Sequence, residues 1–331
     1  MTEFLVPFAY EFFRNGMLAA LLVGGLCGLI GVFIVLRGMS YIGHGLSHAA
    51  FGGAVLGYVL NVNFYVGAGI AGFLAAMLIN QLTKGKQIKS DAAIGIVTTA
   101  FFALGIAIIS RVRSFTQSFE AALFGNILGV SSMDLIIIAS VFVITILAVV
   151  FLYRPLLFST FDPETAGVFG VRTELIQVAF SILLAMAIIA SMNIVGVTMI
   201  AATLVAPAST ARILTDSFSR MLFLSTLLGL VIGAVGMYSS YQFDAASGAT
   251  IVLTGALAFC LALISAFIRD RRAFKAQIHY HGNVAHAHPH DHTDGHAHSH
   301  GPHDHSHDHN HDHEHGDHTH THEGEASPKT V

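Results

Sequence analysis

The chain of 331 residues is 54% hydrophobic and only 11% charged, with a mean hydropathy of +0.67 and a formal net charge of −4. Soluble globular proteins carry about 25% charged residues, so the composition excludes that class and indicates a polytopic membrane protein. Residues 279–331 hold 9 of the 20 acidic residues and one of the 16 basic residues, a balance that suits cations and excludes nucleic acid as a partner.

The predicted elements begin with an aromatic stretch at 2–15, which is too short to span a bilayer and suits the interface. Nine apolar segments follow, each close to the ~20 residues of a spanning helix. They cover residues 16–36, 41–60, 64–82, 91–110, 132–153, 173–192, 194–213, 218–240 and 247–268. We expect an all-α bundle of eight to nine transmembrane helices. The sequence leaves open whether one segment is a half-helix, and with it the side of the N-terminus.

Two histidines stand near the start of the second segment, in the stretch Arg37–Leu60. His44 and His48 are the only histidines before residue 279, and their i, i+4 spacing places both on one face of a helix. Imidazoles in an apolar helix are costly unless they pair, bind a ligand or face water. Two interpretations are open: a pair satisfied by Ser40, Ser47 or backbone, and a path for metal ions.

Lys and Arg predict the orientation of the chain. If the loop after residue 82 is cytoplasmic, 12 basic residues lie inside and 3 lie outside. This asymmetry predicts a protein of the cytoplasmic (inner) membrane with a cytoplasmic C-terminus. No Asp or Glu lies in the middle of a predicted span, which argues against a proton-coupled or sodium-coupled carrier.

A polar interruption at 161–170 predicts a short helix on the cytoplasmic side. Asp162 is a good N-cap, Pro163 suits the first helical position, Glu164 follows, and Gly170 can end the turn. A docking helix and a well-capped loop helix share these local signals. Farther along, Pro207 marks either a pore-lining segment or a kinked packing helix.

The chain divides into a predicted transmembrane domain, residues 1–275, and a cytoplasmic His-rich tail, residues 276–331. The tail has almost no apolar residues, so we expect it to be disordered. It holds 19 of the 21 histidines, interleaved with Asp, and therefore offers overlapping sites for zinc-like ions; neutral low complexity is the alternative. The expected tail ligands are His286, His288, His290, His292, His296, His298, His300, His303, His305, His307, His309, His311, His313, His315, His318, His320 and His322.

Several stretches, in chain order, resemble one family: the membrane permease subunits of zinc, manganese and iron ABC importers. The stretches are 40–49, 90–96, 103–105, 123–128, 161–164, 195–212 and 244–250. Together they span about residues 10–270, so that only the tail lies outside the resemblance.

The resemblance implies a homodimeric permease of the type II ABC importer class, with cytoplasmic ABC ATPase subunits and an extracytoplasmic metal-binding receptor as partners. It also implies that His44 and His48 lie in the translocation path and that the helix at 161–170 couples to the ATPase. The family commonly has Asp where this chain has His44, and imidazole suits zinc better than manganese. We therefore expect zinc as cargo, with manganese or iron as the alternative, and no permanently bound cofactor.

Two other functions compete with this interpretation. A self-contained secondary zinc carrier would work without ATP. An intramembrane metalloprotease would need Glu in the second position of HExxH, where this chain has Gly45. The sequence has no GxxxxGK[ST] phosphate loop, so we expect a transport subunit that is not itself an enzyme, with ATP hydrolysis by a separate subunit.

Overall fold

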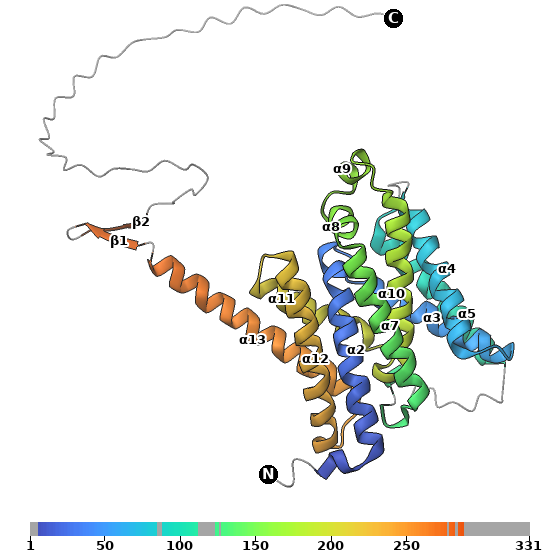
Figure 1. Ribbon diagram of the computed structural model, residues 1–331. Coiled ribbons are helices and arrows are strands. Elements are labelled where there is room, and N and C mark those ends of the chain that lie inside the picture. Colours follow the sequence, from blue (N-terminus) through green and yellow to red (C-terminus); the bar gives the residue numbers. More distant parts are fainter. Residues whose placement is uncertain are drawn as a thin grey trace, which may run out of the picture. The chain divides into compact units, whose positions relative to one another are not determined.

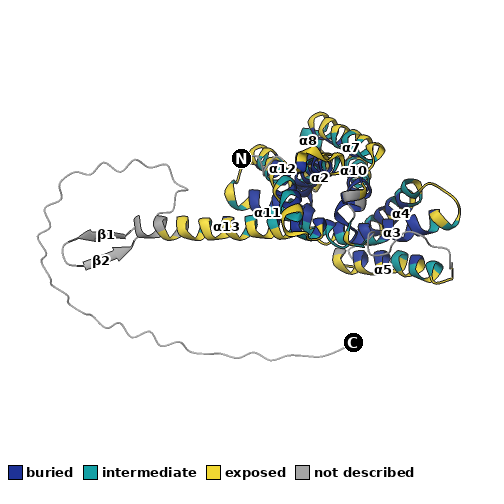
Figure 2. Cartoon of the chain, turned by 90° about the horizontal axis from the view of Figure 1, so that it is seen from below, coloured by how far each residue is buried: buried dark blue, intermediate teal, exposed yellow. Residues whose placement is uncertain are grey.

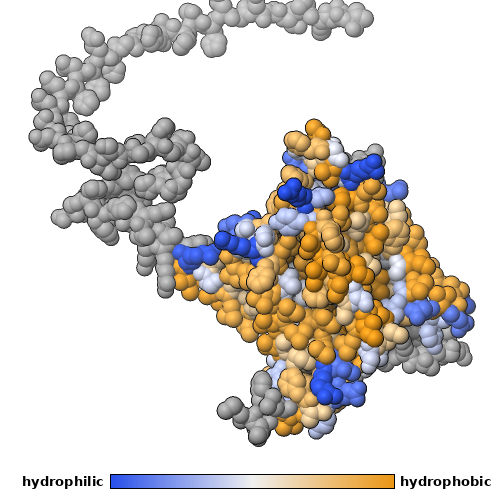
Figure 3. Space-filling model, in the orientation of Figure 1, coloured by the Kyte–Doolittle hydropathy of each residue, from blue (hydrophilic) through white to orange (hydrophobic). Residues whose placement is uncertain are grey.

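The computed structural model describes residues 6–84, 88–111, 123–125, 127–276, 278–281 and 284–287. Residues 6–276 form a bundle of helices in which η1 and α9 lie at opposite ends (Figure 1). On the face that Figure 3 shows, the middle of the bundle is largely apolar and the hydrophilic surface gathers towards the two ends. This distribution is the one that a bilayer requires, and it confirms the prediction of a multi-pass membrane protein.

The helices of the first half are η1 (Val6–Ala9), α2 (Glu11–Leu36), α3 (Ile42–Val59), α4 (Phe64–Lys84), α5 (Ser90–Ile109), η2 (Ile127–Gly129) and α7 (Ser132–Phe151). Those of the second half are α8 (Tyr153–Phe161), α9 (Pro163–Val168), α10 (Thr173–Val195), α11 (Ile200–Leu214), α12 (Phe218–Phe243) and α13 (Ser247–Ala276). Two short strands follow, β1 (Ile278–His281) and β2 (Val284–Ala287), and they pair antiparallel.

Helix α2 is the central element, and it packs against α12, α11 and α7. In its most apolar stretch 78% of the residues are buried, compared with 17% for α7 and for α13. Figure 2 shows the difference, since α13 is exposed along most of its length. The contact with α12 needs small residues, because a Cβ on Gly24 would overlap the Gly229 carbonyl and one on Gly28 would overlap the Ser225 carbonyl.

Helix α3, which carries the two histidines, packs against α4 and α5. A Cβ on Gly52 would overlap the backbone carbonyl of Phe101 in α5. On the other side, a Cβ on Gly53 would meet the backbone and side chain of α4 at Gly67 and Ala71. These two glycines therefore hold α3 close to both neighbours.

Within the described ranges of the chain, seven helices are long and apolar enough to cross a membrane: α2, α4, α5, α7, α10, α12 and α13. Helix α3 has 18 residues but is less apolar, because two histidines and several glycines interrupt it. The predicted span at 194–213 is not one helix, because its first two residues end α10 and its remaining helical part is α11, Ile200–Leu214. The 15 residues of α11 extend about 22 Å, less than the ~30 Å of a hydrocarbon core. The count of eight or nine crossings stays a prediction.

The start of the bundle differs from the expectation of an interfacial segment at 2–15. Helix α2 begins at Glu11, before the predicted residue 16. In the added turn, Phe13 is fully buried and makes edge-on ring contacts with Phe8 and Tyr241 at centroid distances of 5.1 and 5.2 Å. The aromatic residues are thus used partly for packing within the bundle.

Residues 277–331 form a unit of their own. Its first described residues are the hairpin of β1 and β2, in which His279 is opposite His286. Disorder was expected throughout residues 276–331, and the hairpin departs from that expectation where β1 and β2 pair. Residues 288–331 lie outside the described residues, so for them the expectation stays a prediction.

Candidate metal-translocation site

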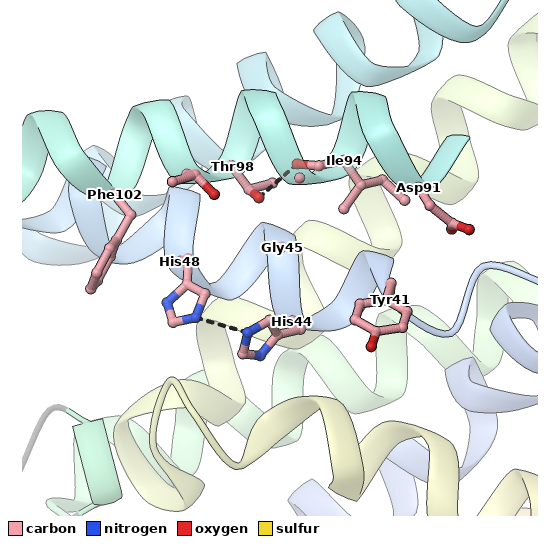
Figure 4. A pocket seen from close by; sticks show the side chains of 10 residues that line it. Tyr41, His44, Gly45, His48, Asp91, Ile94, Thr98 and Phe102 are labelled. Atoms are coloured by element: carbon pink, nitrogen blue, oxygen red, sulfur yellow. Dashed lines mark hydrogen bonds between the residues drawn. The ribbon is translucent and has the colours of Figure 1, made fainter. Parts of the chain in front are cut away.

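His44 and His48 lie one turn apart on α3, as their spacing predicted, and their rings face one another (Figure 4). The two Nε2 atoms are 3.1 Å apart. The ring planes meet at 83°, with 4.4 Å between centroids. Both side chains are partly buried. The structure therefore directs one nitrogen of each imidazole at the same point in space.

Two contacts fix the position of α3 at the histidine pair. The hydroxyl of Ser47, which is fully buried, lies 2.9 Å from the carbonyl oxygen of Val197 and 2.8 Å from that of His44, and donates to these oxygens. On the opposite side of the helix, a Cβ on Gly45 would lie 2.7 Å from side-chain atoms of Ile94 and Thr98. Small residues in α3 thus let α5 and the segment before α11 approach the pair closely.

A pocket of about 420 Å³ opens beside the pair, between α3 and α5 (Figure 4). The helix α3 side contributes Tyr41, His44, Gly45 and His48, and the α5 side contributes Asp91, Ile94, Gly95, Thr98, Thr99 and Phe102. The lining thus includes two imidazoles, one carboxylate and three hydroxyls, those of Tyr41, Thr98 and Thr99. Sequence analysis assigned no role to Asp91, because nothing local places the first turn of α5 beside the start of α3.

The environment of His48 leaves one nitrogen unused. Its ring lies 4.7 Å from that of Phe102, and Nδ1 is buried without a hydrogen-bond partner among the described residues. Ligating histidines ordinarily donate the second ring N–H to a carboxylate, carbonyl or water. Apart from the contact with His44, no hydrogen bond in the described part of the chain orients this ring.

The nitrogen separation suits a shared metal ion. Two nitrogens about 2.1 Å from one ion lie about 3.4 Å apart in a tetrahedron and about 3.0 Å apart at a right angle in an octahedron. The observed 3.1 Å is close to both, so the spacing does not select among metals. The described residues contain no group of three or more His, Cys, Asp or Glu that could hold an ion, so an ion at the pair would find no third ligand of these kinds among them.

The structure supports only in part the interpretation that the two histidines are a pair satisfied by hydrogen bonds to Ser40, Ser47 or backbone. The imidazoles contact one another, but Ser47, one expected partner, donates its proton to backbone carbonyls instead. No hydrogen bond from Ser40 to either ring is found in the described part of the chain. Among the described residues, the pair is therefore stabilised mainly by its own contact.

The predicted short helix at 161–170 is present as α9. Asp162 caps it, with Oδ1 accepting a hydrogen bond from the Thr165 N–H at 2.9 Å, and Pro163 occupies the first turn. Gly170 follows with a φ of +79°, which favours glycine. The Glu164 side chain lies outside the described residues. Sequence analysis missed Val168 and Phe169, which are 86% and 80% exposed at the end of α9.

The remaining predicted elements have different outcomes. Pro207 lies inside α11, which continues as a helix through it. His286 lies in β2, without a described side chain, and the tail histidines from His288 to His322 lie outside the described residues. Metal binding by the tail therefore stays a prediction.

Comparisons with known proteins place this geometry in a family context. A model described as the ABC 3 transport family matches residues 9–266. The manganese transport system membrane protein MntC of Halalkalibacterium halodurans is 39% identical over 254 residues, covering 77% of this chain and 87% of that protein. A probable iron transport system membrane protein of Haemophilus influenzae is 36% identical, covering 81% and 98%. The solved structure of PsaBC from Streptococcus pneumoniae, in complex with Fab, superposes with a TM-score of 0.72 at 36% identity, covering 79% of this chain and 94% of that one.

Proposed function

The chain belongs to the ABC 3 transport family, and from this premise we propose that it is the permease of an ATP-driven importer in which His44 and His48 contact the transported metal ion. One observation carries the assignment of the path: the two Nε2 atoms converge to 3.1 Å at the wall of a pocket between α3 and α5. A purely structural pair has no need of such a pocket.

A second copy of the chain completes the proposed site. One chain offers two imidazole nitrogens, whereas zinc takes four ligands and manganese about six. In a two-fold homodimer, the same helix of each copy can approach the axis and present four imidazoles. A conducted ion must also leave, so that weak coordination by some of these ligands at a time suits transport better than a closed shell.

The proposed partner at the cytoplasmic end is a separate ABC ATPase. Helix α9 is capped on both sides and ends in the exposed Val168 and Phe169, which gives it an apolar tip at the end of the bundle opposite η1. An apolar tip on a rigid short helix fits a cleft in another subunit. A metal-binding receptor on the opposite side and a cytoplasmic C-terminus complete the proposal, the latter from the distribution of basic residues.

The cargo is a divalent transition metal, and two observations favour different ions. The names of the relatives support manganese or iron, which we place first. The imidazole pair supports zinc as the second candidate, because nitrogen ligands suit zinc and oxygen ligands suit manganese. Asp91 lines the same pocket and gives it one carboxylate, but it does not join the pair in a group of three possible metal ligands among the described residues.

The test is metal uptake by the full chain reconstituted in proteoliposomes with its ATPase. Radioactive manganese, iron and zinc are supplied singly and in competition, with and without ATP and with the receptor protein. We expect ATP-dependent uptake of at least one of these metals. Uptake by the chain alone, without ATP or ATPase, would instead establish a secondary carrier, the competing function.

A further inference from the structure

Arg37, the residue directly after α2, joins three helices through its guanidinium. Nη1 donates to Gln177 Oε1 of α10 at 2.7 Å. Nε donates to Thr160 Oγ1 and Nη2 to Ser159 Oγ, both in α8 and both at 3.2 Å. The guanidinium carbon also lies 4.2 Å from the ring centroid of Phe180. One side chain thus holds the ends of α2 and α8 to the first half of α10.

The charge of Arg37 has no carboxylate partner within the part of the chain that the structure describes, since each of its contacts is to a neutral group. Burial lowers the pKa of Arg37 to about 10, so it remains a cation at neutral pH. Two helices, α2 and α8, end beside it, and the carbonyl end of a helix carries partial negative charge. The charge of Arg37 is therefore stabilised in this position only while the ends of α2 and α8 stay together.

Along the chain, the residues that Arg37 joins lie next to α9 on one side and shortly before the histidine pair on the other. Thr160 is two residues before Asp162, the cap of α9. In the other direction, α2 ends in a turn that Gly38 closes with a φ of +65°, with hydrogen bonds from Gly38 to Val35 at 3.2 Å and from Met39 to Ile34 at 3.0 Å. This hydrogen-bonding pattern is that of a Schellman motif, a defined turn. It leads directly into α3 and to His44.

We propose that Arg37 is a positioning residue which transmits displacement of α9 to α3, and so links ATPase movement to the ligand geometry of His44 and His48. The inference rests on the proposed function. It adds the route by which movement of α9 at the ATPase reaches the histidine pair that contacts the metal ion. Arginine suits the role because its planar fork reaches acceptors on two helices at once, which a lysine ammonium on a single stem does not.

The test compares coupling ratios rather than rates. The full transporter is reconstituted with wild-type chain, Arg37→Gln or Arg37→Lys, and both ATP hydrolysis and uptake of radioactive manganese and zinc are measured. Arg154→Gln is the matched control, because Arg154 is an exposed arginine on α8 whose side chain makes no hydrogen bond to another described residue. We expect the metal moved per ATP to fall at least about ten-fold in Arg37→Gln, within the usual range of coupling between sites, while hydrolysis continues.

The remaining outcomes separate this inference from the proposed function. Arg37→Lys should recover part of the ratio, and Arg154→Gln should match the wild type. If Arg37→Gln fails to assemble, the pair Ser159→Ala and Thr160→Val removes the α8 acceptors instead and should lower the ratio in the same way. An unchanged ratio in an active variant overturns the role of Arg37 alone. Absence of ATP-dependent uptake by the wild type overturns the proposed function and this inference with it.

Discussion

The hydroxyl of Ser47 donates a hydrogen bond to the carbonyl oxygen of Val197, 150 residues farther along the chain, at 2.9 Å. This bond joins the helix that carries the histidines to the segment between α10 and α11, where the backbone leaves the helical conformation. Gly196, with a φ of +92°, precedes Val197 and permits that break. The orientation of the histidine pair is thus tied to an irregular segment in the second half of the chain.

Replacement of His48 by Ala should reduce metal uptake at least about ten-fold, because even groups that only support a metal ligand contribute about 10–100-fold. The truncation removes one of the two converging nitrogens and enlarges the pocket beside Phe102. Uptake by reconstituted protein gives the measurement, and size-exclusion chromatography of the assembly is its control. Wild-type uptake by His48→Ala would show that the pair is only a packing feature.

His44→Asp should retain transport and shift its preference towards manganese. The substitution replaces one imidazole nitrogen by carboxylate oxygen, and oxygen ligands suit manganese. The measurement is competition between radioactive manganese and zinc, with His48 unchanged in both proteins. A preference identical to that of the wild type would mean that His44 does not contact the ion during transport.

Gly52→Ala should destabilise the bundle by about 1–3 kcal/mol, the usual effect of inserting a methyl group where there is no space. Its Cβ would overlap the carbonyl of Phe101 and push α5 away from α3, which also distorts the pocket. Gly69→Ala is the matched control, because a Cβ at that helical glycine meets nothing within 4 Å. Thermal unfolding in detergent compares the two, and equal midpoints would contradict the packing argument.

Phe169→Asp should uncouple ATP hydrolysis from transport while leaving membrane insertion intact. The ring is 80% exposed, so its loss costs the isolated chain little, whereas a charge at the apolar tip of α9 opposes docking. Copurification with the ATPase subunit and uptake per ATP are the measurements. Phe169→Leu, which keeps an apolar side chain at the same exposed position, controls for loss of the ring alone. Full copurification and uptake in the α9 variant would remove this helix from the interface.

Removal of residues 279–331 should preserve transport and abolish most zinc binding to the purified chain. The tail holds 19 of the 21 histidines, and imidazoles bind metal only in the neutral form. Binding by the full chain should therefore weaken as the pH falls to about 5–6 and the imidazoles protonate. Isothermal titration with zinc at pH 7.5 and 5.5 tests this. Loss of uptake with normal insertion would instead place the tail in the transport mechanism.

The sequence by itself determined the features that depend on neighbouring residues. Membrane class followed from hydropathy, the shared face of His44 and His48 from the helical repeat, and α9 from the capping chemistry of Asp162, Pro163 and Gly170. Each of these signals arises within about one turn or one span of the chain, so no knowledge of distant contacts was needed to detect it.

Tertiary structure alone decided which surfaces meet. It brought Asp91 into the pocket of the histidines, Ser47 to Val197, and Arg37 to Ser159 and Gln177, and it left Phe169 exposed. In a bilayer, lipid tails are as apolar as the helices, so the hydrophobic pattern does not identify a helix's neighbours. Those neighbours depend on where small residues allow close approach and where buried polar groups find partners, and both are properties of pairs of helices far apart in the chain.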